Sequence, residues 1–168
     1  EAGVAHSEAT GRKTLLDTAV RLADCIEQKF GPGKTSGVCG HPEIELALIR
    51  LYEHTGDARH LETARYFLNE RGRGTDRPLL GEYCQDHAPL AEQQQVVGHA
   101  VRAMYLYSAA TDLARIDNDA RMTPALISLW DNLTLRKMYV TGGIGNSAQN
   151  EGFTTDYDLP NDSAYAET

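Results

Sequence analysis

Apolar residues recur every three to four positions along most of this 168-residue chain, with short Gly, Pro or Asp interruptions between the repeats. This spacing places apolar side chains on one face of an α-helix. Alternation of apolar and polar residues, which is typical of a half-buried strand, is missing. The sequence therefore predicts an all-α protein, and 41% hydrophobic residues are enough to bury a core of ordinary size.

Five helices are predicted, most of them with a recognisable start or stop signal. They cover residues 14–30, about 42–56, 57–72 with Asp57 as N-cap, 92 to about 115, and about 123–139 with Thr123 as N-cap and Pro124 as the first helical residue. The tight turn at Gly56 makes the second and third helices an αα-hairpin. Such hairpins recur about every 35 to 50 residues, a plan compatible with an open solenoid or a closed α/α toroid.

The charge balance argues against two classes of partner. Sixteen Lys and Arg residues oppose 24 Asp and Glu residues, which gives a formal net charge of −8. An acidic surface without basic runs repels nucleic acid and anionic lipid, so we expect neither as a partner. No run approaches the roughly 20 apolar residues that span a bilayer, and the N-terminus lacks the regions of a signal peptide. The three cysteines, Cys25, Cys39 and Cys84, suit neither a disulfide framework nor a zinc knuckle.

Two glycine-rich stretches look like nucleotide-binding loops and fail on context. Residues 31–35, Gly-Pro-Gly-Lys-Thr, lack the first Gly of a phosphate loop because position 28 is Gln, and they follow a helix. Residues 142–145, Gly-Gly-Ile-Gly, lack the third Gly of the dinucleotide fingerprint and a βαβ unit. The second stretch is better explained as a turn after a helix.

Residues 139–168 differ from the rest of the chain, because glycines stand there among many carboxylates, amides and aromatic residues. Carbohydrates are bound by planar hydrogen-bonding groups and aromatic faces, and a carboxylic acid assists cleavage of the glycosidic bond. This segment therefore indicates a sugar site.

Several long blocks of unusual composition occur in order from about Gly40 to the last residue. They are residues 40–48 (GHPEIELAL), 98–105 (GHAVRAMY), 129–133 (LWDNL), 137–145 (KMYVTGGIG), 151–153 (EGF), 156–162 (DYDLPND) and 165–168 (YAET). The chain resembles glycoside hydrolase family 127 in these blocks. The resemblance implies an (α/α)6 barrel built of helical hairpins. Residues 1–168 would be a partial catalytic domain, truncated at both ends and without the C-terminal β-sandwich domains of the family.

The resemblance also implies the chemistry. The family contains retaining exo-enzymes that remove terminal β-L-arabinofuranose with a zinc-bound Cys nucleophile. Glu151 matches the general acid/base, His41 and His99 match sugar-contacting residues, and Glu167 matches a Zn²⁺ ligand. The Cys ligands and the nucleophile would lie beyond Thr168. Without the resemblance, the same residues are a solvated loop carboxylate, a helix-start histidine, a core histidine and a first-turn carboxylate.

Some features leave alternatives open. Cys84 stands where the family usually has His, and Gln149 and Asn150 precede Glu151 in place of a small or His-Gly pair, which bears on substrate preference. No role follows from spacing for Gln94, Gln95, His87 and Asp156.

A competing hypothesis is a non-catalytic helical-repeat module that binds a glycan or a protein. Half a barrel leaves apolar helix faces open, so we expect residues 1–168 alone to be unstable or to self-associate.

Overall fold

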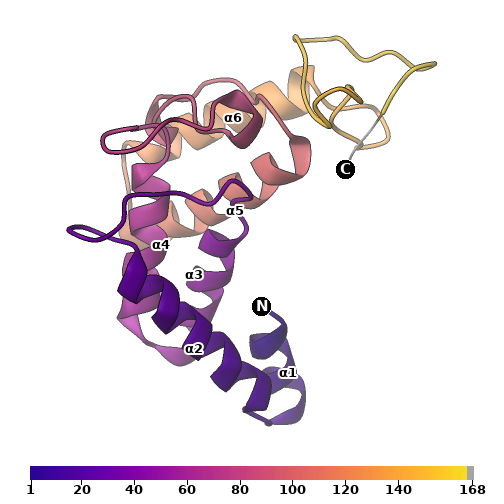
Figure 1. Ribbon diagram of the computed structural model, residues 1–168. Coiled ribbons are helices and arrows are strands. Elements are labelled where there is room, and N and C mark those ends of the chain that lie inside the picture. The colour runs from indigo at the N-terminus through magenta and orange to yellow at the C-terminus, as the bar shows by residue number, and fades with distance from the viewer. Residues whose placement is uncertain (166–168) are drawn as a thin grey trace.

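The computed structural model describes residues 1–165 (Figure 1). Over this range the protein is helical, and its only β-structure is a set of isolated bridges. The elements are α1 (Ala2–Thr10), α2 (Thr14–Lys29), α3 (Ile44–Thr55), α4 (Ala58–Glu70), the short 3₁₀ helices η1 (Glu82–Cys84) and η2 (Leu90–Glu92), α5 (Ala100–Asp117) and α6 (Met122–Arg136). The predicted all-α class is confirmed. None of the described helices is long and apolar enough to cross a membrane.

The helices form three hairpins with short turns. The first helix of each hairpin ends at a residue in the left-handed conformation, where the chain reverses direction. These residues are Gly11, Gly56 and Asn118 after α1, α3 and α5, with φ angles of 71°, 73° and 51°. Asp57 caps α4 as predicted, since its carboxylate accepts a hydrogen bond of 3.0 Å from the backbone N–H of Arg59.

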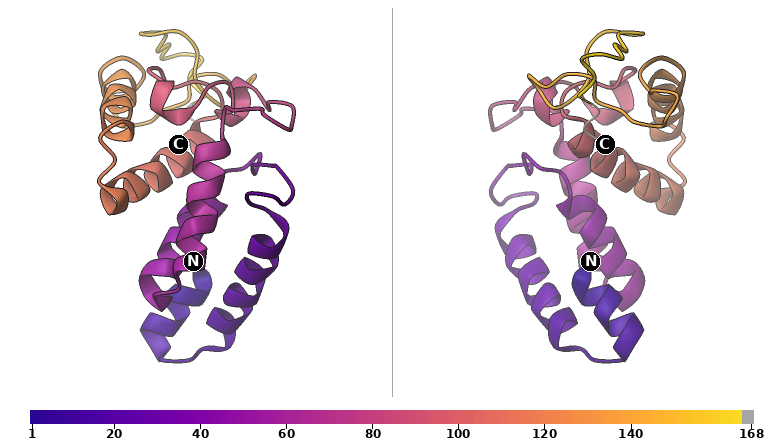
Figure 2. Two further views of the ribbon diagram at one scale, coloured as in Figure 1. Left: turned by 90° about the vertical axis from the view of Figure 1, so that its left-hand side faces the viewer. Right: turned by 90° about the vertical axis from the view of Figure 1, so that its right-hand side faces the viewer.

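The hairpin plan decides where the long connections lie. Because the two helices of a hairpin are antiparallel, the short turns lie at one end of the hairpins and the connections 30–43, 71–99 and 137–165 lie at the other. Figure 2 shows the segments after α4 and after α6 gathered at one end of the molecule, away from the turn between α1 and α2. Three loops that are distant in sequence therefore meet.

The core lies between the hairpins, where α3 packs against both α4 and α5. Its fully or almost fully buried side chains include Leu48, Ile49, Ala64, Phe67, Leu68, Ala103, Leu106 and Ala110. Each large apolar side chain stabilises the fold by about 1.5–3 kcal/mol when it is fully buried. The small alanines of α5 allow the neighbouring helices to approach closely.

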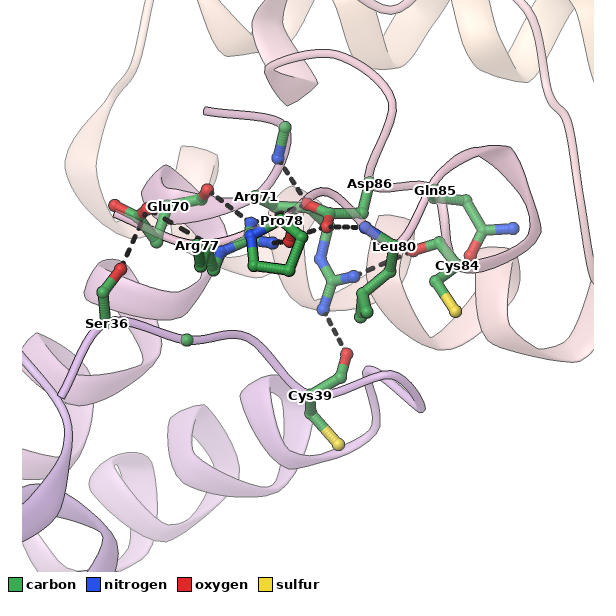
Figure 3. A network of polar contacts seen from close by, with 12 residues as sticks. Ser36, Cys39, Glu70, Arg71, Arg77, Pro78, Leu80, Cys84, Gln85 and Asp86 are labelled. Atoms are coloured by element: carbon green, nitrogen blue, oxygen red, sulfur yellow. Dashed lines mark hydrogen bonds and ion pairs between the residues drawn. The ribbon is translucent and has the colours of Figure 1, made fainter. Parts of the chain in front are cut away.

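A buried ion pair joins two of the long connections to α3. Arg71 and Glu45 have no exposed side-chain surface, and Arg71 Nη2 lies 3.0 Å from Glu45 Oε1. The same guanidinium donates hydrogen bonds of 2.8 Å to the carbonyl oxygens of Cys39 and Cys84 (Figure 3). Burial raises the pKa of Glu45, an effect that the charge of Arg71 opposes.

A second polar cluster shapes the loop between α4 and η1. Asp86 accepts hydrogen bonds from both terminal nitrogens of Arg77, at 2.6 and 2.7 Å, and from the backbone N–H groups of Gly72 and Leu80, each at 2.7 Å (Figure 3). Burial alone would raise the pKa of Asp86, but these donors and the positive charge of Arg77 lower it overall. Hydrogen bonds to this carboxylate therefore hold the loop in place where regular secondary structure is missing.

Two predicted helix starts were wrong, and one helix was missed. The helix expected from residue 92 begins at Ala100, because η2 and an extended stretch precede it; Val96 is buried there as part of a loop. The last helix begins at Met122, since the carboxylate of Asp119 accepts hydrogen bonds from the N–H groups of Arg121 and Met122 and takes the role expected of Thr123. Helix α1 was not predicted, and it buries only Gly3 and Val4.

Candidate active site

Three of the four predicted site residues lie together at the end of the long connections. His99 Nε2 lies 3.3 Å from Glu151 Oε2. The ring of His41 meets the ring of His99 edge to face, with 6.4 Å between the centroids. The fourth residue, Glu167, lies outside the described residues. The structure thus brings His41, His99 and Glu151 together from three different connections.

Direct backbone contacts hold Glu151 beside the start of α5. The carbonyl of Glu151 accepts a hydrogen bond of 3.0 Å from the N–H of Ala100, and Phe153 donates one of 2.9 Å to the carbonyl of Gly98. The first contact satisfies a donor that would otherwise lack a partner at the helix start. Glu151 has a φ of 50°, which is unusual for a residue other than glycine. Its side chain remains 44% exposed, so it can reach a ligand.

Tyr83 completes the group around Glu151, and the sequence analysis did not single it out. Its hydroxyl donates a hydrogen bond of 3.3 Å to Glu151 Oε2, and its backbone carbonyl accepts one of 3.2 Å from the N–H of His99. The guanidinium of Arg102 lies over the Tyr83 ring, 4.6 Å from the centroid. Tyr83 lies in the three-residue helix η1, which is too short to give a periodic signal, so sequence spacing could not have identified it.

Two buried glutamines fix the backbone beneath these side chains. Gln85 is fully buried, and its amide donates hydrogen bonds to the carbonyls of Val97, at 2.8 Å, and His99, at 3.1 Å. The amide of Gln93 in turn donates to the carbonyls of Gln85 and Ala88, while its oxygen accepts from the hydroxyl of Tyr107. The position of His99 is thus set by side chains from its own long loop.

A lysine and an aspartate anchor the loop that carries Glu151. The buried Lys137 ammonium donates to the carbonyls of Thr154, at 2.7 Å, and Val96, at 3.1 Å, and lies 3.6 Å from Asp156 Oδ1. Burial lowers the pKa of Lys137. Burial would raise the pKa of Asp156, but hydrogen bonds from Asn132 and Arg136 and the charge of Lys137 lower it overall. Asp156 therefore has a positioning role.

A cavity of about 410 Å³ with a mixed polar and apolar lining adjoins Tyr83, and Glu151, His99 and His41 are not among its lining residues. The side chains of Glu82, Gln95, Lys137, Asn150, Thr154 and Thr155 contribute to its lining together with Tyr83 and Phe153. Carboxylate, amide and hydroxyl groups beside an aromatic ring can hydrogen-bond sugar hydroxyls and pack against a sugar face. Gln95, to which spacing gave no role, is one of these groups.

The described residues do not build the predicted zinc site. Within residues 1–165, no three His, Cys, Asp or Glu side chains are grouped as metal ligands. The cysteines are free thiols, with Cys25 exposed, Cys39 half-buried and Cys84 buried. The protein ligands that the resemblance implies are Glu167 and cysteines beyond Thr168, all outside this range.

Comparison with known proteins places these features in a family. The profile of the β-L-arabinofuranosidase GH127 catalytic domain matches residues 1–168. A non-reducing end β-L-arabinofuranosidase of Bifidobacterium longum is 39% identical over 188 aligned positions, which cover all of this chain and 29% of that protein. The chain thus spans less than a third of that relative.

Solved structures agree with the sequence match. A GH127 β-L-arabinofuranosidase from Geobacillus stearothermophilus T6 superposes with a TM-score of 0.92 at 43% identity, over 98% of this chain and 29% of that one. A second GH127 β-arabinofuranosidase superposes with a TM-score of 0.91 at 44% identity, over 98% of this chain and 26% of that one. The match confirms that the helical hairpins are part of an (α/α)6 barrel.

Proposed function

Because the chain belongs to glycoside hydrolase family 127, we propose that it supplies the acid/base part of an exo-enzyme that removes terminal β-L-arabinofuranose with retention of configuration. Arabino-oligosaccharides or glycoproteins would be the substrates. Residues 1–168 are then part of a longer catalytic domain, a proposal supported by the 29% of the relative that the chain covers.

Glu151 is proposed as the general acid/base. It would first protonate the glycosidic oxygen that leaves, and then remove a proton from the water that releases the sugar. The observation that supports this role most is the convergence of Tyr83 and His99 on one oxygen of a carboxyl group that remains 44% exposed. A carboxyl group that is held by neighbours but still accessible can approach a bound substrate in a fixed orientation.

The two histidines are proposed as sugar contacts. His41 has a side chain that is 46% exposed, whereas the side chain of His99 is only 9% exposed. An imidazole can donate to one hydroxyl and accept from another, which suits the recognition of a sugar ring. The cavity beside Tyr83 would offer further hydrogen-bonding groups to the substrate.

Zn²⁺ and the Cys nucleophile remain proposals that concern other residues. Glu167 would be one ligand, and the cysteines would follow Thr168. Bound Zn²⁺ would keep a cysteine thiol deprotonated and therefore nucleophilic.

The test is Glu151→Gln in the complete enzyme, with hydrolysis of an alkyl β-L-arabinofuranoside, whose leaving oxygen needs protonation, as the assay. Glutamine keeps the size of the side chain but cannot transfer a proton, so we expect kcat/KM to fall by about 10²–10⁴-fold. Glu62→Gln, which changes a 68% exposed carboxylate on α4, is the matched control and should leave the rate unchanged. Unchanged turnover by Glu151→Gln would favour the non-catalytic helical-repeat module.

A further inference from the structure

The two polar contacts of the Glu151 carboxyl group within residues 1–165 converge on one of its two oxygens. The hydroxyl of Tyr83 and the Nε2 of His99 each lie 3.3 Å from Oε2. Within residues 1–165, Oε1 has no hydrogen-bond partner. The carboxyl group is therefore held by Oε2, and Oε1 is the atom left to face a substrate.

Tyr83 is itself held on several sides. Its ring meets His99 edge to face at a centroid distance of 5.6 Å, and Arg102 covers the ring at 4.6 Å. Arg102 is fixed in turn by hydrogen bonds to the carbonyl of Gly40, at 2.8 Å, and to Cys84 Sγ, at 3.2 Å. The phenol hydroxyl thus has a defined position relative to Glu151.

The guanidinium of Arg102 also affects how strongly the Tyr83 hydroxyl donates a hydrogen bond. A guanidinium above an aromatic ring interacts with its π electrons and favours electron density in the ring. Electron density then shifts from the hydroxyl oxygen towards the ring, which makes the hydroxyl a stronger hydrogen-bond donor. A donor of this kind suits a carboxylate acceptor.

We propose that Tyr83 is a positioning residue for the reaction, and that its hydrogen bond to Oε2 orients the carboxyl group so that Oε1 transfers the proton. This inference rests on the proposed acid/base role of Glu151. Without the bond, the side chain would sample other rotamers, and proton transfer would lose its fixed geometry. The loss in kcat/KM would be larger for a leaving group that must be protonated as it departs.

Tyr83→Phe in the complete enzyme tests this inference on two substrates. Methyl β-L-arabinofuranoside needs protonation of its leaving oxygen, whereas the 4-nitrophenyl glycoside leaves as a stabilised phenolate. We expect kcat/KM to fall about tenfold or more for the methyl glycoside and about twofold for the nitrophenyl glycoside. A residue with a merely structural role would lower both values by the same factor.

Tyr66→Phe is the matched control. The Tyr66 hydroxyl also makes hydrogen bonds, to the carbonyl of Thr35 and from the N–H of Gly37, but it does not contact Glu151. Its removal should leave the ratio of the two kcat/KM values unchanged. Should Tyr83→Phe fail to fold, Tyr83→Met replaces it, because methionine fills part of the space of the ring but has no donor for Oε2 and should change the ratio in the same direction.

A double-mutant cycle gives a second readout. If Tyr83 acts through Glu151, adding Tyr83→Phe to Glu151→Gln should cause no further loss on the nitrophenyl glycoside. Independent, multiplicative losses, or equal losses on the two substrates in the single variant, would overturn the inference while leaving the proposed function intact. Absence of hydrolysis by the unaltered enzyme would overturn the proposed function as well.

Discussion

Gly152 lies directly against Gly98, so that a Cβ added to Gly152 would overlap the carbonyl group of Gly98. The obstacle is backbone and cannot rotate away. We expect Gly152→Ala to lower the free energy of unfolding of the catalytic domain by about 3 kcal/mol and to reduce activity, because Glu151 would be displaced.

Gly11→Ala is a useful contrast for that variant. Gly11 has a φ of 71°, but nothing lies within 4 Å of an added Cβ. Only backbone strain of about 1–2 kcal/mol is expected there. Thermal unfolding and activity should be measured for both variants. The comparison would distinguish the effect of backbone strain at Gly11 from that of steric overlap at Gly152. Equal activity of both variants would contradict a tight contact between the two glycines.

Arg71 should be far more important for stability than an exposed arginine. Arg71→Met would leave Glu45 as an unpaired buried carboxylate and remove the donor to two carbonyls, so we expect a loss of about 3–5 kcal/mol in the free energy of unfolding. Arg50→Met breaks an ion pair with Glu8 whose side chains are 48% and 46% exposed. That change should cost less than about 1 kcal/mol. Similar denaturation midpoints for the two variants would contradict the buried role of Arg71.

Asp86 should make the stability of the domain depend on acid pH. Its pKa is lower in the folded state than in the unfolded chain, so the folded state binds the proton less well. The stabilisation is complete above the unfolded value of about 4 and disappears as the pH falls through the lower folded value. Comparison of the protein with Asp86→Asn by denaturant titration should therefore show a stability difference that is constant near pH 7 and shrinks below about pH 4. A difference that grows on acidification would contradict this sign.

Residues 1–168 should self-associate when produced alone. Ile127 and Trp130 on α6 are 57% and 63% exposed, and Trp130 borders an apolar groove between α5 and α6. Large exposed apolar surface promotes association. Light scattering on an eluting sample should give a mass above that of the monomer, and Ile127→Lys combined with Trp130→Gln should reduce it. A monomer with a cooperative thermal transition would refute this expectation.

Sequence periodicity predicted α2, α3 and α4 well, because each combines an apolar face with a clear stop or cap. It placed the start of α5 too early because Val96 and Val97 continue the apolar pattern through a stretch that is not helical. The predicted helix does not form there, because the amides of Gln85 and Gln93 donate hydrogen bonds to backbone carbonyls of the loop. Helix α1 was missed because its buried face is only Gly3 and Val4.

The site could be predicted only in part. The family blocks indicated Glu151, His41 and His99, and the hairpin plan explains why their loops meet. Tyr83 and the pair of Glu45 and Arg71 were not predicted, because their partners are 68 and 26 residues away in the sequence. Such pairings depend on how the loops pack, which a single sequence does not encode as a local pattern.

The antiparallel hairpins also have a consequence for biosynthesis. The first two can form and bury most of their shared surface while the later part of the chain is still being translated. Glu151 emerges only after α6, and its backbone then closes onto the start of α5. A nascent chain therefore contains His41 and His99 before it contains Glu151, and the three residues can come together only after α6 has been synthesised.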